Sequence, residues 1–302
     1  MISQLKLKLL IIIILNKIYF YFILYLSDNV QNIQYKPMKH AILLLSSYGI
    51  DFLNNFLSQF NNDYRFDIFI HIDGKSKIDI EDKKTIIESN IKYINHLNKS
   101  KKFSVEMVEA MLELLITANK TDNYDYFHYF SDSCYLIKTL DEFYEFFIRN
   151  NNISYMTYHL TRFFLCKKCP FKLFKGSQWM SLHRNIVHKL LDNINMLNMY
   201  KEGIKNKTIE LLRGAPDEFI IQNLIVNDIC KGNPLKKKVI NNNFRFIRWK
   251  NCKYNYCPNY LDIDNVSQEE IKHIKKKGFL IIRKINYKNS KAVELINTLK
   301  NA

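Results

Sequence analysis

HAILLLS (residues 40–46) and FDIFIHID (residues 66–73) are the two stretches that decide the fold of this chain. Both are nearly continuous apolar runs, the pattern expected of parallel strands that are buried on both faces. Residues 50–60, which lie between them, show the helical spacing of apolar side chains. A strand, a helix and a second buried strand in this order predict an α/β fold.

The rest of the chain continues this alternation of strand and helix patterns. Further strands are predicted at residues 91–96, 124–130, 153–160, 239–249 and 279–285. Further helices are predicted at residues 81–89, 104–118, 140–147, 184–196, 217–226, 268–277 and 290–299. No internal repeat and no linker rich in Gly or Pro divides the chain. We therefore expect one folded domain over residues 38–302.

Residues 9–26 are strongly apolar and close to the ~20 residues that a membrane-spanning helix needs. Lys6 and Lys8 precede them, and such a positive flank would keep the N-terminus cytoplasmic and place the domain on the far side of the membrane. Lys17 interrupts the run, at a cost of roughly 2.5–3.5 kcal/mol for insertion. Residues 1–37 are thus either a signal anchor or an extension with no folded role. The second interpretation takes Met38 as the natural start of a cytoplasmic chain.

The charge of the chain limits its partners. Forty-five Lys and Arg against 29 Asp and Glu give a net charge of +16. A basic surface can serve nucleic acid, an anionic membrane or a phosphate-bearing ligand. No nucleic-acid-binding motif accompanies the charge, so we expect no nucleic-acid partner. A ligand that carries a diphosphate remains as the functional interpretation, and solvated surface lysines are the alternative.

The six cysteines do not form a convincing metal site. Cys166 and Cys169 make one CxxC pair, whereas Cys252 and Cys257 are five residues apart. A four-cysteine zinc site needs tight ligand pairs in a defined geometry. Free thiols are therefore expected, with disulfides only in an oxidising compartment.

Three stretches that combine polar and aromatic residues suggest a single site. They read GSQWMSL at residues 176–182, APDEF at residues 215–219 and FRFIRW at residues 244–249. Trp179 alone could serve packing in the core. Asp73 and Ser76 add to the pattern, because they follow the second predicted strand and ligands of open α/β sheets bind beyond the carboxyl ends of strands.

The ordered set of blocks resembles the core-2/I-branching β-1,6-N-acetylglucosaminyltransferase family, which includes the peptide O-xylosyltransferases. The resemblance runs from about residue 40 to residue 285, and GSQW followed by Ser181, Leu182 and Arg184 is its most specific block. The other blocks are the first two strands, Val108-Glu109-Ala110, Pro216-Asp217-Glu218, residues 245–249 and residues 279–284. The resemblance implies a GT-A-type fold, with a mixed, mostly parallel sheet flanked by helices. It also implies transfer with inversion and without a divalent metal or other cofactor.

By this resemblance, Glu218 is the general base that deprotonates the acceptor hydroxyl, a task that suits a carboxylate placed at that proton. The resemblance also implies Lys284 at the nucleotide diphosphate and Asp73 near the uridine. The other donor-side candidates are Ser76, Ser131 and Arg283. Taken alone, Glu218 could instead complement a helix dipole, and Lys284 could be a solvated lysine.

On the acceptor side, the resemblance implies that Trp249 stacks on a sugar ring. The other acceptor-side candidates are Gln178, Trp179 and Arg245. Asp262-Ile263-Asp264 matches the Asp-x-Asp motif of metal-dependent GT-A enzymes in sequence, but it lies late in the chain before a predicted helix. We expect it to be a turn or a helix cap.

Residues 131–136 depart from the Ser-Gly-x-Asp-Tyr-Pro loop of the family, because the Gly, Asp and Pro are replaced. This loop lies close to the donor sugar in relatives. The expected reaction is the transfer of N-acetylglucosamine from a UDP-sugar to a hydroxyl of a glycan acceptor. The alternatives are a xylosyltransferase or another UDP-sugar transferase of this family, and a catalytically idle glycan-binding protein.

Overall fold

The computed structural model describes residues 37–60, 63–76, 78, 90–97, 105–160, 173–205, 215–230, 232–251 and 256–300. The chain divides into two units, Met1–Pro37 and Met38–Ala302, and the fold below is that of the second. The described residues contain no helix that is long and apolar enough to cross a membrane. The candidate anchor at residues 9–26 lies outside them, as does the helix predicted at residues 81–89.

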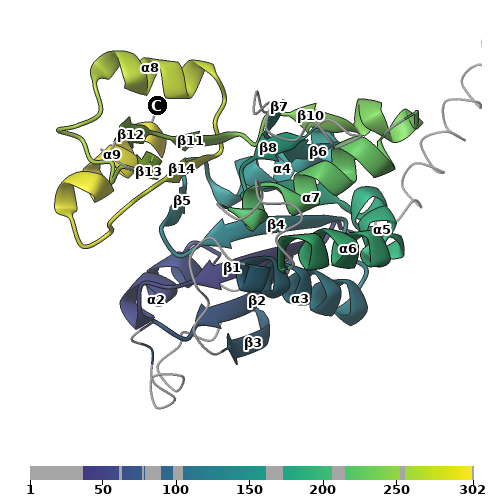
Figure 1. Cartoon of the computed structure of the whole chain (residues 1–302). Coiled ribbons are helices and arrows are strands. Elements are labelled where there is room, and N and C mark those ends of the chain that lie inside the picture. The colour runs from purple at the N-terminus through teal and green to yellow at the C-terminus, as the bar shows by residue number, and fades with distance from the viewer. Residues whose placement is uncertain are drawn as a thin grey trace, which may run out of the picture. The chain divides into compact units, whose positions relative to one another are not determined.

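A seven-stranded sheet in the order β10-β6-β9-β4-β1-β2-β3 forms the centre of the domain (Figure 1). Its strands are β1 (His40–Ser46), β2 (Phe66–Asp73), β3 (Ile91–Leu97), β4 (Tyr126–Ser131), β6 (Ser154–Met156), β9 (Ser181–His183) and β10 (Val239–Asn241). β1 pairs in parallel with both β2 and β4, and β3 extends the parallel part. Only β9 runs antiparallel to its neighbours among these strands. The predicted α/β class with a mixed, mostly parallel sheet is confirmed.

Both faces of this sheet are covered, which explains why β1 and β2 are apolar throughout. Ala41 and Leu43 pack in the core on one face, and Ile42 and Leu44 pack in the core on the other. The first face is covered by α3 (Val105–Thr121), α5 (Arg184–Asp192), α6 (Ile194–Lys205) and α7 (Ile220–Asn223). The second face is covered by α2 (Ile50–Ser58) and α4 (Leu140–Arg149). Hydrophobic burial at both faces therefore stabilises the central strands.

A smaller sheet and two hairpins complete the domain. β11 (Arg245–Ile247), β14 (Ile281–Arg283) and β5 (Cys134–Leu136) form the three-stranded sheet. Its apolar side chains share a third core with α8 (Gln268–Lys276) and α9 (Ser290–Lys300). The hairpins are β7 (Tyr158–Leu160) with β8 (Phe174–Gly176), and β12 (Trp249–Asn251) with β13 (Tyr256–Pro258). The C-terminal elements are yellow in Figure 1, and their strand β14 pairs with β5. Since β5 follows β4 in the chain, the small sheet is connected directly to the large one.

Four predicted elements are divided in the structure. The strand expected at residues 239–249 is split among β10, β11 and the start of β12. Phe244, between β10 and β11, adopts a left-handed φ of 50°. The strand expected at residues 153–160 contributes β6 and β7 to different sheets. The helix expected at residues 184–196 is α5 followed by α6, and Asn193 ends α5. The segment 217–226 is a 3-10 turn, the short α7 and the start of a π-helix.

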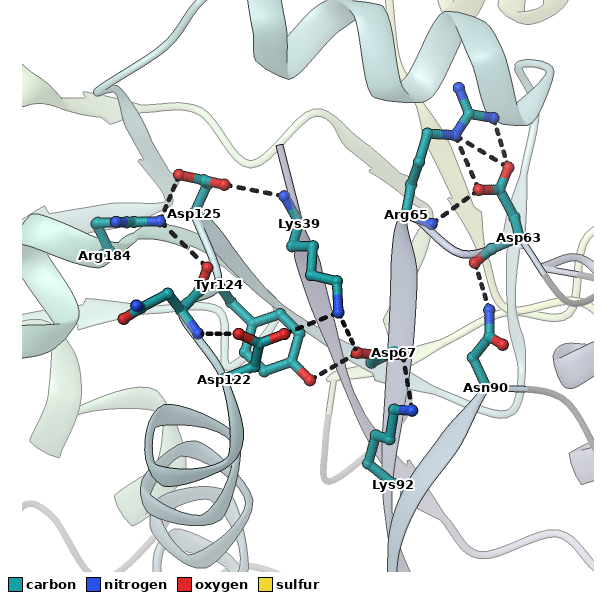
Figure 2. A network of polar contacts seen from close by, with 11 residues as sticks. Lys39, Asp63, Arg65, Asp67, Asn90, Lys92, Asp122, Tyr124, Asp125 and Arg184 are labelled. Atoms are coloured by element: carbon teal, nitrogen blue, oxygen red, sulfur yellow. Dashed lines mark hydrogen bonds and ion pairs between the residues drawn. The ribbon is translucent and has the colours of Figure 1, made fainter. Parts of the chain in front are cut away.

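Figure 2 shows a polar network at the edge of the sheet where β1, β2 and β4 begin. The Nζ atom of Lys39 lies 2.8 Å from Asp122 and 3.4 Å from the buried Asp67. The hydroxyl of Tyr124 donates to the same Asp67 oxygen at 2.8 Å. The backbone N–H of Lys39 donates to Asp125 at 2.9 Å. The starts of three strands are therefore joined to one another, and the opposite edge of the sheet is the one that holds the candidate site.

Candidate active site

The carboxyl ends of β1, β2 and β4 place polar residues along one edge of the large sheet. β1 ends at Ser46, β2 at Asp73 and β4 at Ser131. The turn after β2 is tight, because Asp73 accepts hydrogen bonds from the backbone N–H groups of Lys75 at 3.0 Å and Ser76 at 2.7 Å. The hydroxyl of Ser76 is buried and has no partner among the described residues. Three predicted donor-side residues therefore lie at the edge where α/β proteins bind ligands.

Arg283 connects this edge to the GSQW stretch. Its guanidinium lies over the ring of Trp179, 4.4 Å from the ring centre. It donates hydrogen bonds to the hydroxyls of Ser131 and Ser133, the second at 2.8 Å. A cation held against an aromatic face and two hydroxyls keeps a defined position. The structure thus brings together three residues predicted from separate parts of the sequence.

Lys284 follows Arg283 and has an aromatic environment. Its ammonium lies 4.8 Å from the ring centre of Tyr48 and 4.6 Å from that of Tyr260. Burial raises the pKa of both tyrosines, so these rings stay neutral at physiological pH. A neutral tyrosine face attracts a cation through the ring quadrupole, and the two rings together set where the Lys284 ammonium sits.

Asp132 is a residue of this region that sequence reasoning did not select. Its carboxylate accepts hydrogen bonds from the hydroxyl of Ser46 at 2.9 Å and from the N–H groups of Ser47 at 2.8 Å and Tyr48 at 2.9 Å. Burial raises its pKa, while these donors and the nearby Arg283 lower it. A signal existed in the sequence, because an Asp directly after a buried strand lies at the ligand-binding edge of such a sheet.

Glu218 ends a 3-10 turn that begins at Pro216. Its side chain is 23% exposed, and one oxygen lies 2.9 Å from the ammonium of Lys175. The neighbouring Asp217 is buried, and desolvation together with the charge of Glu218 raises its pKa to about 7. The two carboxylates therefore differ in role: Glu218 is accessible and paired with a cation, whereas Asp217 is enclosed. Lys175 was not predicted, although it directly precedes GSQW.

The GSQW stretch is tied to the Glu218 turn by side-chain amides. Gln222 donates to the carbonyl of Ser177 at 2.9 Å and to that of Asp217 at 3.3 Å. Trp179 is 7% exposed, and its carbonyl accepts from Asn243 at 3.1 Å. Gln178, beside it, is half-buried. The stretch is thus a rigid wall with the Glu218 turn at one end and Arg283 at the other.

Arg245 lies in the interior, which does not fit the acceptor contact expected for it. Its guanidinium donates to the carbonyls of Asn243 at 3.1 Å, Tyr129 at 3.0 Å and Met180 at 3.4 Å. Burial lowers its pKa to about 10. Arg245 therefore supports the GSQW stretch from the interior, through its hydrogen bond to the Met180 carbonyl. Trp249, in contrast, is 48% exposed at the start of β12, so its ring is open to a ligand.

The Asp262-Ile263-Asp264 stretch forms a turn. Asp262 accepts hydrogen bonds from the N–H of Asn265 at 3.1 Å and from Asn289 at 3.2 Å, and Asp264 pairs with Lys291. Ser267, and neither aspartate, caps α8. Within the described part of the chain, no group of three or more His, Cys, Asp or Glu side chains is placed to hold a metal ion. Cys134 and Cys230 are free thiols.

Residues 48–275 match the model of the Core-2/I-branching enzyme family. The chain belongs to this family of glycosyltransferases. The match spans the Glu218 turn, the GSQW wall and Trp249, and it confirms the family predicted from the sequence. No curated protein matches the chain.

Two solved structures show distant similarity to this Core-2/I-branching family member. One is the apo form of the glycosyltransferase GlyE of Streptococcus pneumoniae TIGR4, at 10% identity and a TM-score of 0.39, over 87% of this chain and 60% of GlyE. The other is 4-diphosphocytidyl-2C-methyl-D-erythritol synthase of Anaerococcus prevotii DSM 20548. That match has 9% identity and a TM-score of 0.29, over 53% of this chain and 76% of the synthase.

Proposed function

We propose that the protein is an inverting, metal-independent transferase that moves a sugar from a UDP-sugar to a hydroxyl of a glycan acceptor, with N-acetylglucosamine as the sugar. The observation that carries the proposal is the wall at residues 176–180. One end of it contacts Arg283 through Trp179, and the other end is bonded through Gln222 to the Glu218 turn. A carboxylate and a pair of cations at the two ends of one wall suit a reaction that needs a base and an anionic leaving group.

Glu218 is the general base in this proposal. It takes the proton of the acceptor hydroxyl, and the acceptor oxygen forms a bond to the anomeric carbon from the side opposite the diphosphate. The bond between that carbon and the diphosphate oxygen breaks, so the configuration inverts in a single displacement. The ion pair with Lys175 occupies one carboxylate oxygen and leaves the other for the acceptor.

The donor lies at the carboxyl ends of the strands in this arrangement. Lys284, with Arg283 beside it, stabilises the charge that develops on the departing diphosphate, a task for cations that are already in position. Asp73 and Ser76 contact the uridine. The hydroxyl of Ser76, which is buried and has no partner within the described part of the chain, supports a polar ligand there. Trp249 stacks on a sugar ring of the acceptor, which its exposure supports.

The decisive experiment replaces the base. Glu218→Gln should lower transfer from the UDP-sugar at least about 100-fold, because general base catalysis contributes roughly 10²–10⁴-fold. Calorimetric UDP binding should stay close to that of the wild type. Glu294→Gln, at an exposed position on α9, is the matched control. Wild-type transfer by the Glu218 variant would refute the assignment.

Two further measurements test the mechanism and the donor. Transfer should survive chelation of divalent metals, and complete loss in EDTA with recovery in Mn²⁺ would contradict the metal-independent mechanism. A screen of UDP-sugars by UDP release separates N-acetylglucosamine from xylose and other donors. The idle glycan-binding alternative is motivated by the replacement of the family's Gly, Asp and Pro within residues 131–136. It predicts no turnover with any donor.

A further inference from the structure

The turn between β1 and α2 is held by a carboxylate from another part of the sheet. One oxygen of Asp132 receives the hydroxyl of Ser46 and the successive N–H groups of Ser47 and Tyr48, at 2.8–2.9 Å. Two successive N–H groups that converge in this way form an anion-binding concavity. The first strand-to-helix turn of many α/β proteins uses such groups for the phosphates of a ligand. Here the protein supplies the anion itself.

The side chain of Tyr48 transmits this constraint to Lys284. The backbone N–H of Tyr48 is bonded to Asp132, and its ring packs on Phe52 with the ring centres 5.2 Å apart. The same Tyr48 ring lies 4.8 Å from the Lys284 ammonium. Tyr260 completes the enclosure of the ammonium at 4.6 Å. A displacement of the turn would therefore displace one of the two rings that hold Lys284.

We propose that Asp132 is a positioning residue of the donor site: its carboxylate fixes the turn after β1, and through Tyr48 the turn fixes the Lys284 ammonium for the donor diphosphate. The inference rests on the proposed function, because it takes Lys284 as the ligand of the diphosphate. Asp132 touches neither the donor nor the acceptor. It acts through the side chain of Tyr48, which keeps the Lys284 ammonium in position for the departing diphosphate.

The geometry favours a carboxylate over an amide of the same size. A single oxygen receives all three donors, and the second oxygen is buried with no partner among the described residues. Hydrogen bonds to an ionised acceptor are roughly twice as strong as neutral ones. An amide oxygen would hold the same donors more weakly, so the turn would loosen while the fold around it stays intact.

Calorimetry of UDP binding to the full chain tests the proposal. Asp132→Asn should weaken UDP binding roughly tenfold, within the range of coupling for residues of one network. Lys284→Met should weaken it as well. When both changes are combined, Asp132→Asn should add almost nothing, because the residue through which it acts is gone. Acceptor KM should change little in any of these variants.

Asp67→Asn is the matched control, because Asp67 is also a buried carboxylate with several donors but lies at the opposite edge of the same sheet. It should lower the melting temperature and leave UDP affinity unchanged. Should Asp132→Asn fail to fold, Tyr48→Leu carries the same test, with the same loss of affinity and the same lack of additivity with Lys284→Met.

The outcomes separate this inference from the proposed function. Normal UDP binding by Asp132→Asn, or an equal loss with and without Lys284, would overturn the positioning role while Lys284 remains a donor ligand. Normal UDP binding by Lys284→Met would overturn both the donor site and the inference that depends on it.

Discussion

Gly176→Ala should destabilise the protein and disturb the site at the same time. A Cβ atom at Gly176 would lie 1.8 Å from the carbonyl oxygen of Thr157 and 3.0 Å from Cγ of Gln222. Contacts below 3.0 Å essentially never occur, so the backbones must separate by about 1.2 Å. Gly176 pairs with Tyr158 in the β7–β8 hairpin, and a clash with a carbonyl cannot be relieved by rotating a side chain. Overpacking of this kind typically costs about 1–3 kcal/mol.

The same displacement should reach the carboxylate of Glu218, the proposed base. Lys175 precedes Gly176 on β8 and pairs with Glu218, while the following Ser177 is bonded to Gln222. A shift of about 1 Å in a group that positions reactants can cost on the order of 100-fold in rate. We therefore expect kcat to fall by one to two orders of magnitude in the fraction of Gly176→Ala that is folded.

The control is Gly278→Ala, which separates steric overlap from backbone strain. Gly278 has a left-handed φ of 65°, but a Cβ atom there meets nothing within 4 Å. Its cost should be about 1–2 kcal/mol from conformation alone, with no change in transfer. Urea unfolding and kcat are measured on the same preparations. Wild-type stability of Gly176→Ala, or full activity of that variant, would refute the steric reasoning.

Three further changes test the site. Lys175→Met should lower kcat with little change in the KM for the donor, because the Glu218 carboxylate loses its partner. Lys175→Arg should restore part of the rate. An unchanged kcat in the Met variant would show that the ion pair is dispensable. Trp249→Ala should raise the acceptor KM and leave UDP affinity unchanged, with Trp249→Phe intermediate; an effect on UDP instead would move Trp249 to the donor side. Asp217 has its pKa raised from 3.8 to about 7, so its protonated form contributes stability that is complete below pH ~4 and lost as the pH rises through 7. The free energy of unfolding should therefore fall by about 2–3 kcal/mol more in the wild type than in Asp217→Asn between pH 5 and pH 8, and equal pH dependence in urea titrations would contradict this assignment.

Some of the site could be read from local pattern and some could not. Glu218, Trp179 and Lys284 lie in blocks whose residue types and order mark a family. Lys175 lies outside the blocks that carry the resemblance, and Asp132 lies in the loop that departs from the family's pattern. Neither residue was selected, because the contacts of both are with partners distant in the sequence. Lys175 meets Glu218 across 43 positions, and Asp132 meets Tyr48 across 84. Such pairings are created by the folded chain.

The sequence alone determined the buried strands of the large sheet and the family. Continuous apolar runs such as residues 40–46 can be stabilised only where both faces of a strand are covered, so their burial follows from composition. Only the tertiary structure decided that Arg245 supports the wall from inside. Its guanidinium is satisfied by carbonyls of Tyr129 and Met180, 116 and 65 positions away. A buried cation is stable only where such acceptors converge, and that convergence depends on how β4, β11 and the wall pack together.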